Sequence, residues 1–348
     1  MNHPKVSIVI PVYNVEIYIT DCLQSVMNQT YQGPMECIVV DDCGTDKSMD
    51  IAESLIAEYN GPIEFRVLHH EKNLGLSWAR NTGIDAALGD YVFFLDSDDI
   101  ITDDCVDVLT SQLKKGDFDV VVGNNDCFGK ITKPGMLIPE EGLKVSGEQF
   151  VMRYLDGRQV VGAVWNKLYS LDYLKKNNML FEPGLVLEDH VYNFRLSCYP
   201  TKMYVINKIT HHYRFCREGS IDFELVGNPE VQKGWLVQVW KYFRSYCEAD
   251  KYNEIHEMAL HCYGKLIFTY CQGNHLEYKD IFCNLNRNYP YHPVLIWLSG
   301  KRSFRWLISR LIWVFPPLIA FYYYETKLYG VSGMRRIKGK FSNASKQQ

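Results

Sequence analysis

The sequence predicts an α/β protein in which a mostly parallel sheet is flanked by helices and followed by a helical C-terminal extension. Three observations predict this fold class. Short apolar runs alternate with segments of helical periodicity over the first hundred residues, and each apolar run ends in a cluster of polar residues. The chain of 348 residues is also 47% hydrophobic and 22% charged, which is ordinary for a globular protein with a large core.

Four short runs rich in β-branched and aromatic residues predict strands. They are residues 5–10, 36–40, 64–70 and 91–95. Strands that alternate with helices at this spacing form right-handed βαβ units and a parallel sheet that is covered on both faces. We therefore expect these four strands to lie side by side in one sheet.

Three helices are predicted between these strands. Residues 15–27 carry apolar side chains at helical spacing, and Thr45 or Asp46 is placed to cap a second helix. A third helix is expected over residues 76–88, where Gly89 would provide a left-handed stop.

Polar residues at the strand ends predict a binding site. The four strands run into PVYN, DDCGTD, HHEKN and DSDD. The carboxyl ends of parallel strands meet at one edge of a sheet, and ligands bind in the crevice outside that edge. The acids Asp96, Asp98 and Asp99 are costly to bury together unless a partner neutralises them.

That partner is expected to be a divalent cation carrying a nucleotide diphosphate. Neither G-x-G-x-x-G nor G-x-x-x-x-G-K-[ST] follows the first strand, which disfavours a dinucleotide or a P-loop nucleotide. An Asp-x-Asp pair offers the hard oxygen ligands that suit Mg²⁺ or Mn²⁺ sharing its coordination with phosphate oxygens. The net charge of −4 combines an acidic body with a basic tail, and the acidic body argues against nucleic acid as the main partner.

Four motifs occur in an order and spacing that resemble the family 2 glycosyltransferases: VSIVIPVYN, VVDDCGTDKS, NLGLSWARNTGI and DYVFFLDSDD. The resemblance implies a GT-A catalytic domain in residues 1–215. Residues 1–100 would form its Rossmann-like, nucleotide-sugar-binding half and residues 101–215 its acceptor-binding half. Residues 216–348 would then form a helical, aromatic-rich C-terminal region.

The resemblance also implies a pocket for the nucleotide base. Pro11 and Tyr13 would line it with Asn14 beside them, and Tyr13 would pack on the base. Asp42 would accept a hydrogen bond from the base, which favours uracil and hence a UDP-sugar, while Asp41 belongs to the same turn. Without the resemblance, the two acids before a glycine could simply cap a loop.

Further residues carried over from the family face the rest of the donor. Asn73 and Arg80 would face the ribose or diphosphate. Asp98 would be the direct metal ligand, and Asp96 would contact the sugar or ribose and assist with the metal. An isolated Asp-Ser-Asp-Asp is more often a solvated turn, but four polar clusters at one edge of a sheet favour a site.

The second half of the sequence contains a candidate general base. In LVLEDHVYNFRLSCY (185–199), helical spacing places Glu188 and Asp189 in the first turn of a helix. Acids there also favour the positive end of the helix dipole, which is an alternative explanation. By the resemblance, Asp189 is the base that deprotonates the acceptor hydroxyl, and Glu188 is the reserve candidate.

The motif VWNK has a family counterpart near the acceptor sugar. Its residues here are Trp165, Asn166 and Lys167. Trp165 could stack on a pyranose or be a core residue. His211, His212 or Arg214 could reach the diphosphate, although a buried and satisfied histidine is the more common case.

The last residues of the chain differ from its body. After residue 300 the chain contains many basic residues but a single acid, Glu325. Residues 306–324 form its most apolar stretch. This stretch is interrupted and short for a membrane span, so residues 301–340 are expected to lie on a membrane surface, or else to pack on the catalytic domain or a second copy. Scattered cysteines and no leader sequence indicate a cytoplasmic protein, peripheral on the cytosolic face of the membrane.

Together these features predict an inverting, metal-dependent glycosyltransferase that moves a sugar from a nucleotide-diphosphate sugar to a glycan or lipid-linked acceptor. The alternative from another class is a catalytically silent relative that binds nucleotide sugar or scaffolds a glycan assembly complex. A nucleotidyltransferase would share the acid-plus-metal chemistry, but it is expected to carry a Gly- and Lys/Arg-rich loop after its first strand, and PVYNVEIYI is not one.

Overall fold

The computed structural model describes most of the first 249 residues. The described residues are 3–129, 141–142, 144–145, 163–197, 199–221, 223 and 228–249, with the single positions 267, 270, 271, 274 and 276. The strands are β1 (Val6–Val12), β2 (Met35–Asp41), β3 (Glu64–His69), β4 (Tyr91–Phe94), β5 (Ile100–Ile101), β6 (Val120–Phe128), β7 (Lys144–Val145), β8 (Lys167–Ser170) and β9 (Met203–Arg214). The helices are α1 (Ile19–Met27), α2 (Ser48–Glu58), α3 (Leu76–Ala86), α4 (Cys105–Ser111), α6 (Leu171–Lys176), α7 (Glu188–Ser197) and α9 (Pro229–Ala249), with a 3-10 turn η1 (Gln112–Lys115) after α4.

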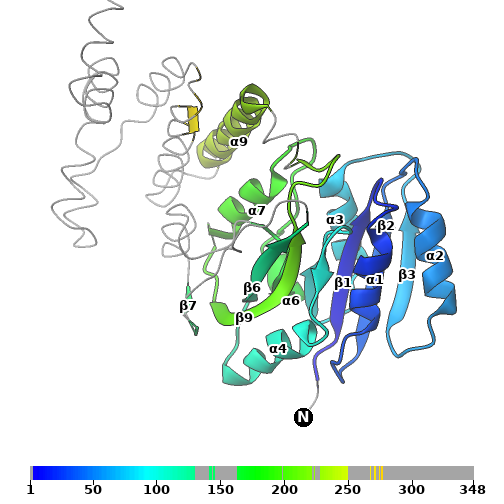
Figure 1. The fold of residues 1–348 in the computed structure, drawn as a ribbon. Helices are drawn as coiled ribbons and strands as arrows, with labels where there is room; N and C mark the ends of the chain where they lie inside the picture. Colours follow the sequence, from blue (N-terminus) through cyan, green and yellow to red (C-terminus); the bar gives the residue numbers. More distant parts are fainter. Residues whose placement is uncertain are drawn as a thin grey trace, which may run out of the picture. The chain divides into compact units, whose positions relative to one another are not determined.

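The strands form one sheet, which confirms the predicted α/β class (Figure 1). Its order is β3-β2-β1-β4-β8-β6-β9-β5, and β7 pairs with β9. The four predicted strands, β1 to β4, are parallel neighbours. From β4 onward the sheet is mixed, because β8 enters antiparallel between β4 and β6.

The parallel strands end in register. Val12 lies opposite Asp41, and Asp41 lies opposite His69 on β3. The polar residues that follow β1, β2 and β3 therefore leave the sheet at the same edge. This register places the predicted nucleotide-binding motifs together.

Both faces of the parallel part are buried, as expected for strands rich in β-branched residues. Ile8 and Ile10 of β1 pack with α1 and α2, whereas Val9 faces the other way and packs with α3. Figure 1 shows the same layers, with α1 and α2 on one face of the sheet and α3 on the other. The alternation follows from the two-residue period of a strand.

Two predictions of local structure were wrong. Helix α3 ends at Ala86, and Gly89 does not adopt the left-handed conformation. A Cβ on Gly89 would instead lie 2.6 Å from Ser7 Oγ and 2.8 Å from Ser7 N, so glycine is required there by close packing. Neither Thr45 nor Asp46 caps α2 from the N-cap position, which is Lys47, although Asp46 accepts hydrogen bonds from Ser48 N and from Glu16 N.

The second half of the domain brings the acidic loop against β9. Strand β5 follows the acidic residues directly and pairs antiparallel with β9, so that Ile101 lies opposite His211. Strand β9 also runs parallel to β6, where Asn125 lies opposite His211. His211 therefore lies on the middle strand of three, between β6 and β5, and β5 follows the acidic residues directly.

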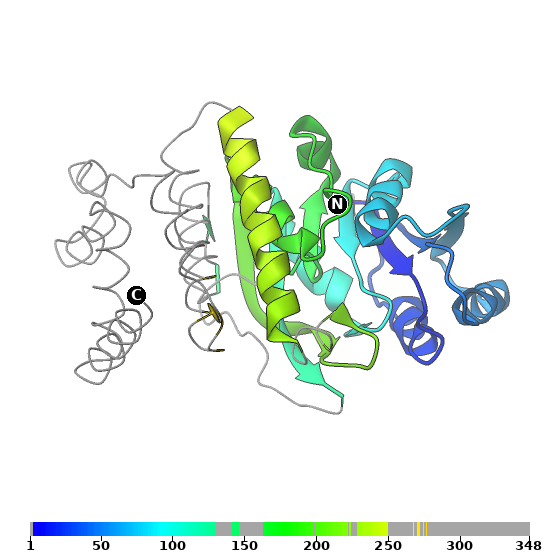
Figure 2. The ribbon, with the colours of Figure 1, turned by 90° about the horizontal axis from the view of Figure 1, so that it is seen from above.

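The chain divides into two compact units, Met1–Phe243 and Arg244–Gln348. The first unit continues past residue 215, the predicted domain end, and includes most of α9, a single long helix in Figure 2. Phe243 of α9 stacks on Phe194 of α7, and Tyr242 donates a hydrogen bond to Glu182. The predicted membrane-surface segment 301–340 lies outside the described residues.

Among the helices that the structure describes, none combines the length and the apolar character needed to span a membrane.

Candidate active site

A pocket of about 420 Å³ lies where the parallel strands end. Ten of the residues predicted for the site line it: Pro11, Tyr13, Asp42, Asn73, Arg80, Asp96, Asp98, Trp165, Glu188 and Asp189. They come from the end of β1, from the loops after β1, β2, β3 and β4, from α3, from the segment before β8 and from the start of α7. The fold thus brings both halves of the predicted site into one pocket.

Four predicted residues do not line the pocket. Asn14 and Asp41 accept hydrogen bonds within the loops that form the pocket. Asn166 and Lys167 are buried and do not line it. Asn166 is 1% exposed and its amide spans Asn124 O and Thr210 Oγ1. Lys167 is fully buried and donates to Ala163 O. The predicted contact of these two side chains with an acceptor therefore has no counterpart in this geometry.

The loops after β1 and β2 are tied together under Tyr13. Asn14 adopts a positive φ of 50°, and its Oδ1 accepts a hydrogen bond of 2.8 Å from Thr45 N. Cys43 also has a positive φ, and its N–H donates to Asp41 Oδ1 at 2.9 Å. The side chain of Tyr13, 46% exposed, stands at the edge of the pocket.

Asp42 fixes the loop that carries Asn73. Its Oδ1 and Oδ2 accept hydrogen bonds of 2.8 Å from the backbone N–H groups of Leu74 and Gly75. Oδ1 also lies 2.8 Å from His70 Nδ1. Asp42 is therefore an orienting group for this loop as well as a lining residue.

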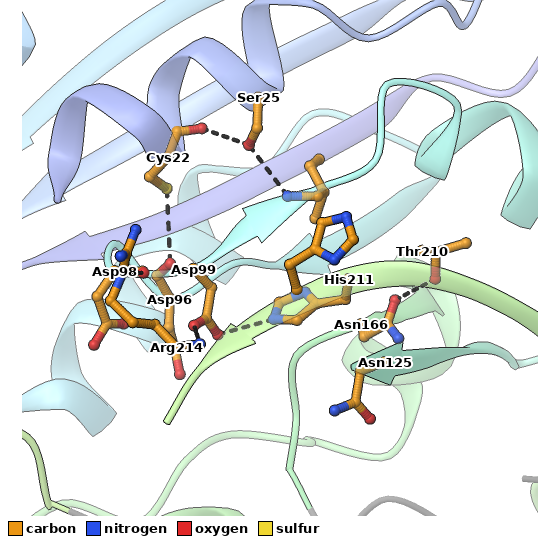
Figure 3. A network of polar contacts seen from close by, with 12 residues as sticks. Cys22, Ser25, Asp96, Asp98, Asp99, Asn125, Asn166, Thr210, His211 and Arg214 are labelled. Atoms are coloured by element: carbon orange, nitrogen blue, oxygen red, sulfur yellow. Dashed lines mark hydrogen bonds and ion pairs between the residues drawn. The ribbon is translucent and has the colours of Figure 1, made fainter. Parts of the chain in front are cut away.

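Each acid after β4 has its own partner in the protein, and Figure 3 shows the pair that Asp99 forms with His211. Asp96 Oδ1 lies 2.7 Å from Arg80 Nη2, Asp98 pairs with Arg217 Nε, and Asp99 Oδ2 lies 2.8 Å from His211 Nε2. Burial and mutual repulsion raise the pKa of Asp98 and that of Asp99. Asp96 and Asp98 are thus each paired with a guanidinium, whereas Asp99 contacts the imidazole of His211.

Arg80 connects the two halves of the pocket. Its side chain is 2% exposed, and its two terminal nitrogens contact Asp96 Oδ1 at 2.7 Å and Glu188 Oε1 at 2.5 Å. Both acids raise the pKa of the guanidinium against the opposing effect of burial. Its buried Nε has no hydrogen-bond partner among the described residues.

Asp189 is held at the start of α7 and has a raised pKa. Burial raises its pKa to about 6, although Arg80, the N–H of His190 and Lys167 all act to lower it. The His190 N–H donates to Asp189 Oδ1 at 2.8 Å, which fixes the carboxylate at the start of α7. The preceding residue, Leu187, adopts a positive φ of 67°, which is costly for a bulky side chain and is typical of functional sites.

Trp165 lies on a layer of aromatic side chains from β9. Its ring stacks on His211 with centroids 4.4 Å apart and on Tyr213 at 5.1 Å. His211 is a buried and hydrogen-bonded histidine, as the commoner case predicts, and burial lowers its pKa to about 3. Arg214 does reach the pocket, where it also donates from Nε to Asp98 O at 2.8 Å.

Residues 217–221 were missed by the sequence reasoning. Arg217, Ser220 and Ile221 line the pocket, and Arg217 forms the ion pair with Asp98. A signal was present in the polar run REGS, which closely follows the strand-like residues of β9 as the other polar clusters follow β1 to β4, but that strand was not predicted.

The acidic residues fit the predicted divalent cation. Asp96 and Asp98 line the same pocket, and the carboxylate of Asp98 is already engaged by a cationic group, the Arg217 guanidinium. The described residues contain no cluster of three or more metal-binding side chains. Two carboxylates that share a cation with phosphate oxygens are a common arrangement for Mg²⁺.

Comparison with known proteins identifies the family. The model of glycosyl transferase family 2 matches residues 7–176. Glycosyltransferase GlyG of Streptococcus pneumoniae is 31% identical over 223 residues, a match that covers 62% of this chain and 72% of GlyG. The chain spans less than two thirds of several other curated relatives, down to 31% of one of them.

Solved structures share the fold. The crystal structure of S. aureus TarS 1–349 in complex with UDP-GlcNAc has a TM-score of 0.65 at 22% identity, and the match covers 82% of each chain. The mannosyltransferase PcManGT from Pyrobaculum calidifontis, in complex with GDP-Man and Mn²⁺, has a TM-score of 0.53 at 14% identity, over 95% of this chain and 89% of that one.

The chain belongs to glycosyl transferase family 2. This confirms the predicted family and the predicted GT-A fold, and the class of enzyme that the sequence predicted is the class of this family.

Proposed function

We propose that the protein transfers a sugar from a nucleotide-diphosphate sugar, with a UDP-sugar favoured, to a hydroxyl group of a glycan or lipid-linked acceptor, with inversion at the anomeric carbon. The observation that carries this proposal is the arrangement around Arg80. One guanidinium lies between Asp96, on the side of the strand ends, and Glu188, which is adjacent to the candidate base Asp189. A donor site and a deprotonating group are therefore parts of one pocket.

The donor is assigned to the strand-end side of the pocket. Tyr13 and Pro11 offer an apolar surface to a base, and Asp42 offers a hydrogen-bond acceptor. A UDP-sugar is supported by the family and by the UDP-GlcNAc bound to TarS, which shares the fold. Arg214 and Arg217 line the same region and supply positive charge for a diphosphate.

A divalent cation is assigned to Asp98 and Asp96. Mg²⁺ or Mn²⁺ held there would stabilise the negative charge that develops on the leaving diphosphate. Support comes from the hard oxygen ligands and from the Mn²⁺ that accompanies GDP-Man in PcManGT. Arg217 must give up its contact with Asp98, or share it, when the cation binds.

Asp189 is assigned as the general base. It removes the proton from the acceptor hydroxyl while the oxygen attacks the anomeric carbon, and the sugar–phosphate bond breaks with its electrons going to the diphosphate. Glu188 is paired with Arg80, so Asp189 is the freer of the two acids. A single attack from the face opposite the leaving group inverts the anomeric configuration.

The acceptor is assigned to the side of Trp165. The indole lines the pocket together with Leu187 and Asp189, and an aromatic face suits the apolar face of a pyranose. Lipid-linked acceptors and a peripheral position at the cytosolic membrane face are supported only by the basic, aromatic segment 301–340. Binding of the intact chain to anionic but not neutral vesicles, reduced by salt, tests that part.

The reaction is tested by measuring UDP release from UDP-GlcNAc and from other UDP-sugars, with Mn²⁺ and with p-nitrophenyl glycosides as acceptors. We expect turnover with at least one donor, loss of turnover on chelation, and loss in Asp189→Asn. The anomeric configuration of the product, read by NMR from the coupling constant of its anomeric proton, tests inversion. Normal turnover by Asp189→Asn would remove Asp189 as the base.

A catalytically silent nucleotide-sugar-binding or scaffold protein is the alternative. It would bind a UDP-sugar in the presence of Mn²⁺, seen as a rise in melting temperature, but release no UDP with any acceptor. The raised pKa of Asp189 favours the enzyme, because a scaffold has no use for a buried base.

A further inference from the structure

Asp99 is the acid of the DSDD loop that does not line the pocket. It is fully buried, and both of its oxygens are engaged. Oδ1 accepts a hydrogen bond of 2.8 Å from Arg214 N, and Oδ2 lies 2.8 Å from His211 Nε2. Figure 3 shows Asp99 turned from Asp96 and Asp98 toward His211 on β9. The role of Asp99 is therefore different from cation binding, because both of its oxygens are engaged within the protein.

His211 supports the indole of Trp165. The two rings are nearly parallel, with an interplanar angle of 7° and centroids 4.4 Å apart. Tyr213, two residues further along β9, stacks on the same indole at 5.1 Å and 23°. Residues two apart on a strand project from the same face, so the two rings form a flat support from one element.

The plane of the imidazole depends on Asp99. The contact with Asp99 engages Nε2, whereas the buried Nδ1 has no hydrogen-bond partner among the described residues. An imidazole with one hydrogen bond is oriented by that bond and by packing alone. Loss of the Asp99 contact would therefore free the ring on which Trp165 rests.

We propose that Asp99 and His211 are positioning residues that fix the plane of the Trp165 indole and thereby the orientation of the acceptor sugar relative to Asp189. The proposal rests on the proposed function, in which Trp165 is the acceptor surface. It gives the third acid of the DSDD loop a role in acceptor binding, while its neighbour Asp98 serves the donor side.

Asp99 and His211 also connect the acidic loop to β9. Arg214 donates its backbone N–H to Asp99 and its Nε to the carbonyl of Asp98. Strand β5 continues directly from this loop and pairs with β9 at Ile101 and His211. The indole support and the acidic loop therefore share one rigid frame.

Four variants test the proposal. His211→Gln retains a donor at the position of Nε2 but removes the flat ring, and Asp99→Asn changes the hydrogen bond while retaining the shape. Trp165→Ala removes the supported indole. His212→Gln is the matched control. His212 was also a candidate for the diphosphate, but it does not line the pocket: it is the next residue on β9, is 36% exposed and pairs with Asp126.

The readouts are the KM for a p-nitrophenyl glycoside acceptor, the KM for UDP-GlcNAc, and hydrolysis of UDP-GlcNAc without acceptor, all with Mn²⁺. We expect His211→Gln and Asp99→Asn to raise the acceptor KM by about five- to tenfold, the range of a lost aromatic contact. Donor KM and hydrolysis should stay within about twofold of His212→Gln, which is the scatter expected for a neutral surface change. Combined with Trp165→Ala, His211→Gln should add no further loss, because both act through the indole.

An acceptor KM equal to that of His212→Gln, an equal loss in donor hydrolysis, or additivity with Trp165→Ala would overturn the proposal. A crystal structure of Asp99→Asn gives a readout that needs no activity. The indole plane should tilt from its present 7° to the imidazole, and an unchanged plane would contradict the inference. If the unaltered protein releases no UDP, the proposed function fails, whereas the indole plane still decides the role of Asp99 and His211.

Discussion

Arg80 and Glu188 are separated by 108 residues in the sequence and form a buried ion pair with Nη1 2.5 Å from Oε1. Arg80 belongs to α3, which packs on one face of the parallel strands, and Glu188 begins α7 in the second half of the domain. Because Arg80 also binds Asp96, one side chain compensates two acids that would otherwise repel each other. The geometry of the whole pocket depends on this guanidinium.

Replacing Arg80 should therefore destabilise the fold as well as the site. Arg80→Met leaves the buried carboxylate of Glu188 and the partly exposed one of Asp96 without this partner, and we expect a loss of about 3–5 kcal/mol in the free energy of unfolding. Urea denaturation at neutral pH measures this loss. Arg66→Met is the comparison, because Arg66 also pairs with a buried acid, Glu36, but its own side chain is 31% exposed. A loss no larger than that of Arg66→Met would contradict the bridging role.

Asp98→Asn should separate cation binding from folding. The substitution removes one of three neighbouring negative charges, and the pKa of Asp98 is already raised by burial and by Asp96. We expect little loss of melting temperature without ligand, but loss of the Mn²⁺-dependent rise that UDP produces in the unaltered protein. Asp126→Asn, on β6 outside the pocket, should retain that rise. A full rise in Asp98→Asn would remove this residue as a metal ligand.

The raised pKa of Asp189 predicts how activity depends on pH. A base must be ionised, so kcat/KM should fall as the pH drops through about 6, the pKa that burial gives this carboxyl group. The acid limb of the profile measures this value. A limb near pH 4, the ordinary range of an aspartate, would contradict the raised pKa of Asp189.

The same shift predicts a gain in stability on substitution. The pKa of Asp189 is higher in the folded state than in the unfolded chain, so the folded state binds more protons between pH 4 and 6, and its stability falls as the pH rises through that window. At neutral pH the ionised, partly buried carboxylate is destabilising. Asp189→Asn should therefore be more stable than the unaltered protein by roughly 1–3 kcal/mol at pH 7 and show a smaller dependence on pH between 4 and 6. A less stable variant would contradict this sign.

Gly89 and Gly234 should respond in opposite ways to alanine. A Cβ at Gly89 would meet the backbone of Ser7 and Lys5 within 3 Å, so we expect Gly89→Ala to cost about 1–3 kcal/mol through overpacking. A Cβ at Gly234, within α9, meets nothing within 4 Å, so Gly234→Ala should stabilise the helix by up to about 1 kcal/mol. Thermal denaturation compares the two. Equal effects would show that close packing is not what requires glycine at position 89.

The sequence alone determined the parallel half of the fold and its ligand-binding edge. Strand and helix periodicity is a local property, and the polar clusters after β1 to β4 lie directly behind the runs that predict those strands. Pro11, Tyr13, Asp42 and Asp98 therefore occupy the pocket as expected. The acids Glu188 and Asp189 could be found for the same reason, because their place in the first turn of a helix follows from spacing.

Only the tertiary structure decided which group pairs with which acid. The antiparallel insertion of β8 beside β4, and the pairing of β5 with β9, bring together residues more than a hundred positions apart, such as Asp99 and His211. The same strand order buries Asn166 and Lys167, which the VWNK motif had suggested for the acceptor. Burial and pairing depend on strand order and register across the whole sheet, and these are not encoded in the spacing of neighbouring residues.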